Sequence, residues 1–317
     1  DLHLSLRRQR QMCIRDSRLC WDEDLCHILG VPLSMLPEAL PSNAHYGSVS
    51  SDIMSHQPPI CGVAGDQQAS LYGHCCFEPG SVKNTYGTGC FMLMNLGEKP
   101  TDSQNGLVTT IGIADDTHLD YALEGSIFQA GSVIQWLRDG LGLITDAAQS
   151  EDIARSVPNT GGCYIVPAFT GMGAPWWDAD ARGVICGLTR GVDRARLVRA
   201  ACESLAYQTY DILKAMEADS GQELTALKVD GGASANNFIM QFQADLMDIK
   251  VVRTPQNETT ALGAAYLAGI ACGFWDSREE VASLASHGDV FTASMSGLTR
   301  ERLLAGWRAA VRKAISR

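Results

Sequence analysis

The sequence predicts an α/β fold in which a mixed sheet is flanked by helices. The first observation is a pair of short apolar segments, 81–85 and 91–95, separated by a Gly-Thr-Gly turn, which is typical of an antiparallel hairpin. The second is a later strand over 226–229 that turns at two glycines into a helix over 235–247. A strand and a helix repeat that order within 251–272, so the sheet is expected to combine antiparallel and parallel strands.

The remaining elements follow from hydrophobic periodicity and turn residues. Helical turns before residue 41 are closed by Pro32 and Pro37, and a short apolar strand delivers Asp66 at its end. Asp193 is expected to cap a long helix. In chain order the expected ranges are a strand over 60–64, a helix over 67–75, two β-meander strands over 107–114 and 119–123, a helix over 126–143, a strand over 163–166, and the helix from Asp193 to about 218.

Composition limits the class of protein. The chain has 317 residues, of which 45% are hydrophobic and 19% are charged, enough for one large domain or two modest ones. Its net charge of −11 argues against nucleic acid as a main partner, because no basic stripe is available to neutralise phosphates. The 11 cysteines and 7 histidines are scattered without metal or disulfide spacing, which indicates a reducing cytoplasm and no metal cluster. The longest uncharged apolar run, 261–275, is too short to span a bilayer.

The first 17 residues differ from the rest because they hold four arginines in an otherwise acidic chain. An Arg-rich start is compatible with an organelle transit peptide. The alternative, which we favour, is a foreign and unstructured leader, because the pattern described below begins abruptly near Arg18. Residues 1–17 are therefore not expected to be part of the fold.

Residues 83–91 (Lys-Asn-Thr-Tyr-Gly-Thr-Gly-Cys-Phe) carry the strongest functional signal. The turn offers flexible backbone, unhindered N–H donors and one hydroxyl, which suit a triphosphate that must be approached closely. On its own the turn is more often a hairpin without a ligand. Two companions change that balance: Gly-Asp-Gln-Gln at 65–68 and Asp-Gly-Gly-Ala-Ser-Ala-Asn-Asn at 230–237.

Together these motifs resemble the FGGY carbohydrate kinases, in the sugar-kinase branch of the actin-like ATPases. Within that family they are most similar to the members that phosphorylate glycerol. Further matches occur in order at 122–125, 135–139, 167–178 and 260–266. The resemblance covers residues 18–317 and implies an actin-like, RNase-H-like fold. It also implies that 18–75 is a remnant of the first domain and that 76–317 is the ATP-binding second domain.

The resemblance implies a catalytic and substrate-binding role for residues near the start of helix 67–75. Asp66 matches the general base that takes the proton of the attacking substrate hydroxyl. Gln67 would bind another hydroxyl of the substrate, and Phe91 would lie against its carbon skeleton. Without the resemblance, Asp66 is more often a helix cap and Phe91 more often a core residue.

The resemblance also implies an ATP site. Thr88 would hydrogen-bond the transferring phosphoryl group, which is charge stabilisation rather than covalent chemistry. Gly232 would let the backbone lie against the nucleotide, and Asn236 would begin a helix with its amide free to bond. Gly131 and Gln135 match nucleotide-contacting positions. Taken alone, these two are a packing glycine and a solvated glutamine.

One motif of the superfamily is missing from the sequence: the first phosphate loop, which also helps to place Mg²⁺. The expected identity is therefore a fragment of an ATP-dependent kinase that makes glycerol 3-phosphate from glycerol. By itself the fragment is expected to be inactive, and the whole protein is expected to be a cytoplasmic homo-oligomer. Two alternatives stay open: a related kinase of a pentulose or gluconate, and a non-catalytic nucleotide-binding protein of actin-like fold.

Overall fold

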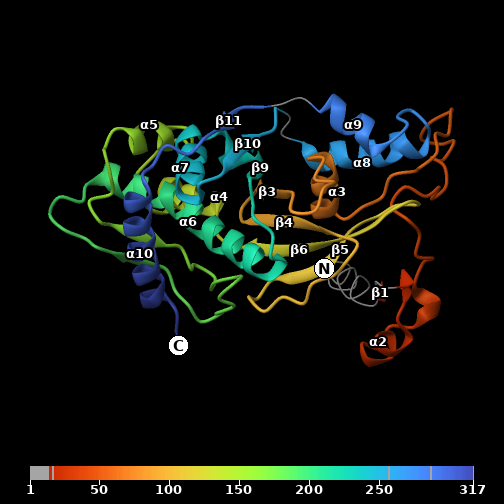
Figure 1. Ribbon diagram of the computed structural model, residues 1–317, viewed down its shortest axis with the longest axis horizontal. Coiled ribbons are helices and arrows are strands. Elements are labelled where there is room, and N and C mark those ends of the chain that lie inside the picture. The colour runs from red at the N-terminus through yellow and green to blue at the C-terminus, as the bar shows by residue number, and fades with distance from the viewer. Residues whose placement is uncertain (1–13, 16–17, 256–257, 286–287, 317) are drawn as a thin grey trace.

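The computed structural model describes residues 14–15, 18–255, 258–285 and 288–316. A seven-stranded mixed sheet forms its centre, with the strand order β11-β10-β9-β3-β4-β6-β5 (Figure 1). β3 pairs in parallel with β9 and β9 with β10, while the other pairs are antiparallel. The strands are β3 (Val82–Tyr86), β4 (Cys90–Gly97), β5 (Val108–Ala114), β6 (Leu119–Ile127), β9 (Ala226–Gly231), β10 (Lys250–Arg253) and β11 (Val290–Phe291).

Helices cover both faces of this sheet, and the side chains of β4 point alternately to the two faces. Met92 and Met94 are fully buried in the large core, while Leu93 between them packs with Leu71 on the opposite face. In Figure 1, α3, α8 and α9 group at one end of the molecule and α5, α6, α7 and α10 at the other. The helices are α2 (Glu23–Ile28), α3 (Asp66–Gly73), α4 (Gly131–Gln135), α5 (Gln149–Arg155), α6 (Arg194–Ser220), α7 (Asn237–Met247), α8 (Thr259–Ala271), α9 (Arg278–Leu284) and α10 (Gly297–Ala314).

Local sequence signals explain how the longest helix is bounded. Asp193 caps α6 by accepting a hydrogen bond from the Arg196 backbone N–H at 3.0 Å, as predicted. Gly221 ends the helix in the left-handed region with φ at +68°, where glycine meets no steric penalty. The apolar side of α6 packs on α7 and α5 and is part of the main core.

A small second sheet lies beside α10. It pairs β7 (Tyr164–Val166) with β8 (Val184–Cys186) in antiparallel order. The loop between them carries Asp178, which accepts hydrogen bonds from the backbone N–H and the hydroxyl of Ser316. The carboxyl end of the described chain is thereby tied to this loop.

Several predicted elements are confirmed, and three differ. The hairpin of β3 and β4 forms with Val82 opposite Met94 and Tyr86 opposite Cys90. The predicted strand over 60–64 is wrong, because this segment bonds to a loop: the Val63 N–H donates to the Ser42 carbonyl at 2.9 Å. The predicted meander order is also wrong, since β6 lies between β4 and β5.

The third difference is the helix expected over 126–143. Ser126 and Ile127 belong to β6, because they pair with Phe91 and Cys90 of β4. The helix begins only at Gly131 and becomes a π-turn over Trp136–Gly140. The apolar residues within 126–143 therefore belong to two different elements, the end of β6 and the helix that begins at Gly131.

The start of the chain is described only in part. Of the predicted leader, residues 1–13 and 16–17 lie outside the described residues. Ile14–Arg15 form β1, which pairs antiparallel with Cys20–Trp21 of β2. Within the described part of the chain, no helix is both long and apolar enough to cross a membrane.

Candidate active site

Asp66 is the first residue of α3, and its carboxylate is exposed to solvent. The N-cap residue of this helix is Gly65. Asp66 therefore does not have the capping role that an aspartate near a helix start more often has. Its Oδ1 accepts the backbone N–H of Gln67 at 2.9 Å, and its Oδ2 accepts the Gln67 Nε2 at 3.3 Å. A carboxylate at a helix N-terminus is also favoured by the helix dipole. The side chain is thus held in place while it still faces water.

Beneath Asp66 lies Lys83, a fully buried lysine on β3. Its Nζ donates to the Gln67 Oε1, to the Thr85 Oγ1 at 3.1 Å and to the Phe91 carbonyl at 3.3 Å. Burial lowers the pKa of Lys83 to about 8, although the nearby carboxylate of Asp230 opposes that shift. Lys83 therefore joins three elements at the base of the site.

A buried polar cluster continues from Lys83 under α3. The Ser70 hydroxyl lies 2.9 Å from the Thr85 hydroxyl and 3.2 Å from that of Thr259. Thr259 donates to Asp230, whose Oδ1 is 3.3 Å from the His74 Nε2. Burial alone would raise the pKa of Asp230, but the contact with His74 and the Thr259 hydroxyl outweigh it and lower that pKa. These contacts fix α3, and Asp66 with it, against β3, β9 and α8.

The Gly-Thr-Gly turn of the hairpin supports the start of α4. The Thr88 carbonyl accepts the N–H groups of Ala130 at 2.9 Å and Ser132 at 3.1 Å. A Cβ on Gly131 would lie 2.5 Å from the Gly87 carbonyl oxygen, so only glycine allows this close approach. Thr88 itself is exposed, and its hydroxyl makes no hydrogen bond with the part of the chain that the structure describes.

The second glycine turn lies directly beside the first. In the parallel pairing of β3 with β9, Gly231 is opposite Tyr86, so both strands deliver their turns to the same edge of the sheet. Gly231 has a φ of +86°, which strongly favours glycine. The next residue, Gly232, is exposed, and a Cβ placed on it would meet no atom within 4 Å. The backbone at Gly232 is therefore open to a ligand.

Asn236 differs from its predicted state, because its amide is not free. Its Oδ1 caps α7 by accepting the Ile239 N–H at 3.0 Å, and its Nδ2 donates to the buried Ser150 hydroxyl at 3.1 Å. Only one N–H of the amide remains for a ligand. Gln135 lies one turn after Gly131 on α4, with its side chain exposed.

Most of the predicted residues thus lie along one edge of the sheet. Thr88 and Gly232 follow the ends of β3 and β9, and Asn236 follows the Gly232 turn. Gly131, the first residue of α4, donates its N–H to the Gly87 carbonyl at 3.1 Å. Asp66 begins α3, which is bound to β3 through Gln67 and Lys83 and through Ser70 and Thr85. The exposed Phe91 lies opposite Thr85 on β4. Gln135 is connected to the other predicted site residues only because it lies on α4, which begins at Gly131, and its side chain is exposed.

Three charged residues of the site received no role from the sequence: Lys83, Glu124 and Asp230. Burial raises the pKa of Glu124, and Lys83 opposes that shift. The sequence did contain a signal of a buried polar cluster. Lys83 and Asp230 each fall within a short strand that is otherwise largely apolar.

The described residues do not form a metal site by themselves. No group of three or more His, Cys, Asp or Glu side chains within the described ranges is arranged to hold a metal ion. Mg²⁺ in kinases is usually bound by one or two carboxylates together with substrate phosphates.

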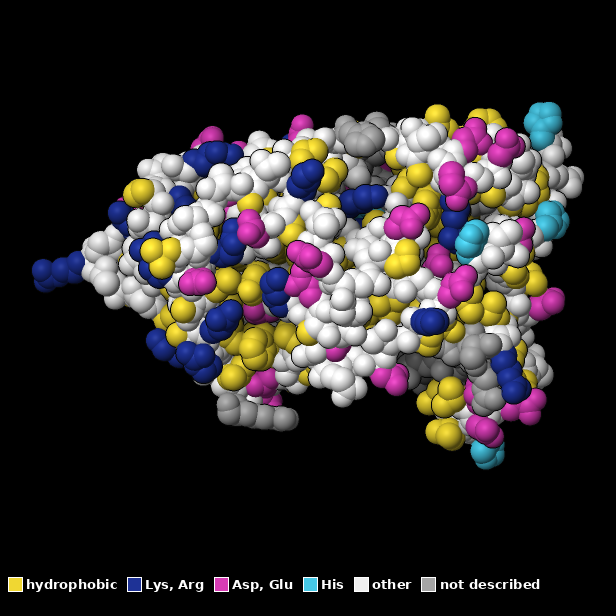
Figure 2. Space-filling view, viewed as in Figure 1, with side chains coloured by type: hydrophobic (Ala, Val, Ile, Leu, Met, Phe, Trp, Pro, Cys, Tyr) yellow, Lys and Arg dark blue, Asp and Glu magenta, His cyan; other side chains and the backbone are white. Residues whose placement is uncertain are grey.

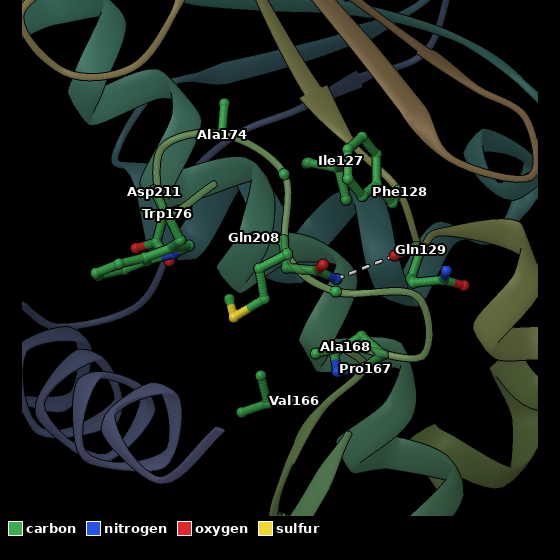
Figure 3. Close-up of a pocket in the computed structure, with 13 residues that line it drawn as sticks. Ile127, Phe128, Gln129, Val166, Pro167, Ala168, Ala174, Trp176, Gln208 and Asp211 are labelled. Atoms are coloured by element: carbon green, nitrogen blue, oxygen red, sulfur yellow. Dashed lines mark hydrogen bonds between the residues drawn. The ribbon is translucent and has the colours of Figure 1, made fainter. Parts of the chain in front are cut away.

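A separate small cavity lies between β6 and the 166–176 loop (Figure 3). Its volume of about 20 Å³ is enough for one water molecule. Asp211 lines it, and burial raises the pKa of that carboxyl to about 6. None of the predicted site residues lines this cavity, so it is distinct from the candidate active site.

Known proteins resemble the chain over most of its length. Glycerol kinase from Carboxydothermus hydrogenoformans is 58% identical over 306 residues, which are 96% of this chain and 61% of that protein. The crystal structure of Plasmodium falciparum glycerol kinase with ADP superposes with a TM-score of 0.90 at 38% identity, over 96% of this chain and 62% of that one. Ligand-bound xylulose kinase from Lactobacillus acidophilus has a TM-score of 0.80 at 20% identity, over 93% of this chain and 60% of that one.

The fold is therefore that of the actin-like ATPases, with a mixed sheet between helices. The chain spans about 61% of the length of the curated relative that it matches at 58% identity. The profile of the C-terminal domain of the FGGY family of carbohydrate kinases matches residues 82–272. The chain belongs to the FGGY family of carbohydrate kinases.

Proposed function

We propose that this chain supplies the general base and most of the ATP site of a glycerol kinase. The whole enzyme would transfer the γ-phosphoryl group of ATP to a terminal hydroxyl of glycerol and form glycerol 3-phosphate. The observation that carries this proposal is the exposed Asp66 carboxylate, which Gln67 holds in place at the start of α3. The two glycine turns of Thr88 and Gly232, which follow the neighbouring strands β3 and β9, accompany it. The 58% identity to a glycerol kinase supports the choice of substrate.

In the proposed reaction, Asp66 accepts the proton of the glycerol hydroxyl as its oxygen attacks the γ-phosphorus. The bond from that phosphorus to the bridging oxygen of ADP breaks, and ADP leaves. The Thr88 hydroxyl and the N–H groups of its turn stabilise negative charge on the transferring group. Gln67 binds a second glycerol hydroxyl, and the exposed ring of Phe91 covers the carbon chain.

The nucleotide is bound along the same edge of the sheet. The open backbone at Gly232 lies against the adenosine, and Asn236 contributes its remaining amide N–H. Gly131 and Gln135 contact the nucleotide from α4. ATP is used as its magnesium complex. Residues 76–317 form the ATP-binding domain, residues 18–75 belong to the other domain, and the whole enzyme is a cytoplasmic homo-oligomer.

The alternative within the family is a kinase of a pentulose or gluconate. The 20% identity to the xylulose kinase and the 58% identity to the glycerol kinase favour glycerol. A non-catalytic nucleotide-binding protein has no need for an exposed and oriented carboxylate at Asp66, so this observation favours an enzyme.

The test is an assay of substrate-dependent ADP formation. Residues 18–317 are joined to the part of the Carboxydothermus hydrogenoformans relative that they do not span, and the chimera receives glycerol, xylulose or gluconate. We expect turnover with glycerol, and none with residues 1–317 alone. Preference for xylulose or gluconate would establish the alternative kinase, and ATP binding without turnover on any of the three would establish the non-catalytic protein.

A further inference from the structure

Lys83 is a buried cation for which the proposed reaction has no assigned use. Its side chain has no exposed surface, and burying an ammonium group is costly unless its N–H donors are satisfied. An ammonium has three N–H donors and no acceptor. In this structure they are directed to the Gln67 Oε1, the Thr85 Oγ1 and the Phe91 carbonyl.

The donors of Lys83 define the orientation of the Gln67 amide. Because the ammonium can only donate, the atom of Gln67 that faces it must be the oxygen. The Gln67 Nε2 is then directed to the other side, where it donates to the Asp66 Oδ2 at 3.3 Å. The Gln67 backbone N–H binds the other carboxylate oxygen at 2.9 Å. A continuous series of hydrogen bonds therefore runs from Lys83 through Gln67 to Asp66.

The same ammonium connects the elements that carry the site. Gln67 lies on α3, Thr85 on β3 and Phe91 on β4. The backbone carbonyl of Phe91 is thus held by the group that also holds Gln67. Displacing a reacting group by about 1 Å can cost about 10²-fold in rate, so such a connection has catalytic consequences.

We propose that Lys83 is a positioning residue for phosphoryl transfer: it fixes the Gln67 amide and, through it, the Asp66 carboxylate. The inference rests on the proposed function, in which Asp66 is the base. Lys83 is fully buried, and its ammonium is bonded to Gln67, Thr85 and the Phe91 carbonyl, so it would act through these groups and not on the substrate directly. Its effect is therefore on the geometry of the base and of the groups around glycerol, and not on nucleotide binding.

The inference includes a dependence on pH. Burial lowers the pKa of Lys83 to about 8 against the opposing charges around it. The groups that raise it are Asp230 on β9, Cys76 after α3, Glu124 on β6 and Asp66 on α3. His74, which follows α3, and Cys90 on β4 also face Lys83. Above pH 8 the neutral amine has two N–H donors for three acceptors, and the Gln67 amide loses its defined orientation. The kcat of the enzyme should fall with a midpoint near that pH.

Lys228 provides a matched control. It is the partner of Lys83 in the parallel pairing of β3 with β9, and it is also a strand lysine, whose ammonium binds the two residues that follow α3. Its Nζ donates to the carbonyls of His74 at 2.7 Å and Cys75 at 3.1 Å, at the end of α3 away from Asp66. Lys228→Met removes a comparable ammonium group without removing a donor to Gln67.

The experiment uses the chimera described above and compares Lys83→Met with Lys228→Met. For Lys83→Met we expect kcat to fall by about 10²-fold, the KM for ATP to change little and the limb near pH 8 to disappear. For Lys228→Met we expect wild-type kcat and an unchanged pH profile. A double-mutant cycle with Gln67→Leu should show that Lys83→Met costs much less once the amide is gone than it does in the wild type.

Three results would overturn the inference while the wild-type chimera is active: near-normal kcat in Lys83→Met, additive losses in the cycle, or no alkaline limb in the wild-type profile. The last measurement needs no variant, so the inference is tested even if Lys83→Met does not fold. A wild-type chimera that binds ATP but shows no glycerol-dependent turnover would instead refute the proposed function on which the inference rests.

Discussion

The carboxylate of Asp66 is accessible and yet oriented, because two N–H groups of Gln67 bind its two oxygens. Asp66→Asn keeps the size of the side chain but cannot accept a proton. We expect the kcat of the chimera to fall by about 10²–10⁴-fold with little change in the KM for ATP. Steady-state kinetics with each substrate varied measures this, and Asp52→Asn, an exposed aspartate outside the site, is the control. Near-normal kcat in Asp66→Asn would remove Asp66 from the role of base.

Lys83 also predicts how stability changes with pH. Its pKa is about 8 in the folded chain and ordinarily 10.5, so between these values the unfolded chain binds more protons. The stability of the wild type therefore rises with pH across this window, and the penalty of burying the ammonium is fully present below it. A shift of this size corresponds to about 3 kcal/mol. Urea unfolding of residues 1–317 at both ends of this pH window measures the effect. From the lower to the higher pH, the free energy of unfolding of the wild type should rise by about that much relative to Lys83→Met. Equal changes in the two proteins would contradict the lowered pKa of Lys83.

At the scale of elements, the two glycine turns meet because β3 and β9 are parallel neighbours in register. Gly232→Ala adds a methyl group to open space, so we expect the free energy of unfolding to change by less than about 1 kcal/mol. The same methyl group would occupy the place proposed for the nucleotide and should weaken ATP binding by about tenfold, which is about 1.4 kcal/mol. Calorimetric titration and thermal melting measure the two quantities. The control is Gly297→Ala, at a glycine with equally open surroundings, which should change neither the stability nor the ATP affinity appreciably. Unchanged ATP affinity in Gly232→Ala would exclude this turn from the nucleotide site.

At the scale of the whole molecule, the arm formed by residues 18–36 protrudes from the body and exposes apolar side chains (Figure 2). Ile28 is 74% and Met35 69% exposed. Because exposed apolar patches promote association, we expect purified residues 1–317 to self-associate at micromolar concentration. Light scattering should show that Ile28→Ser with Met35→Ser reduces association. Leu298→Ser, at an equally exposed leucine on α10, should have no such effect, and equal reductions would show that the arm is not responsible.

Sequence patterns determined much of the local structure. Alternating apolar residues around a Gly-Thr-Gly turn define the hairpin, and Asp193 and Gly221 define the ends of α6, because these signals act within a few residues. The resemblance of ordered motifs to the FGGY kinases indicated the family that the profile over 82–272 shows.

Only the tertiary structure decided the contacts between distant segments. The place of β6 between β4 and β5 depends on pairing across the sheet. The absence of a strand over 60–64 likewise depends on a hydrogen bond to the Ser42 carbonyl, which periodicity does not report. The Asn236 amide caps α7 through a local hydrogen bond, but its second bond required Ser150 of α5 to lie beside it. The position of Lys83 beneath Gln67 is of the same kind: its residue type is written in the sequence, but its three acceptors come together only when α3, β3 and β4 pack.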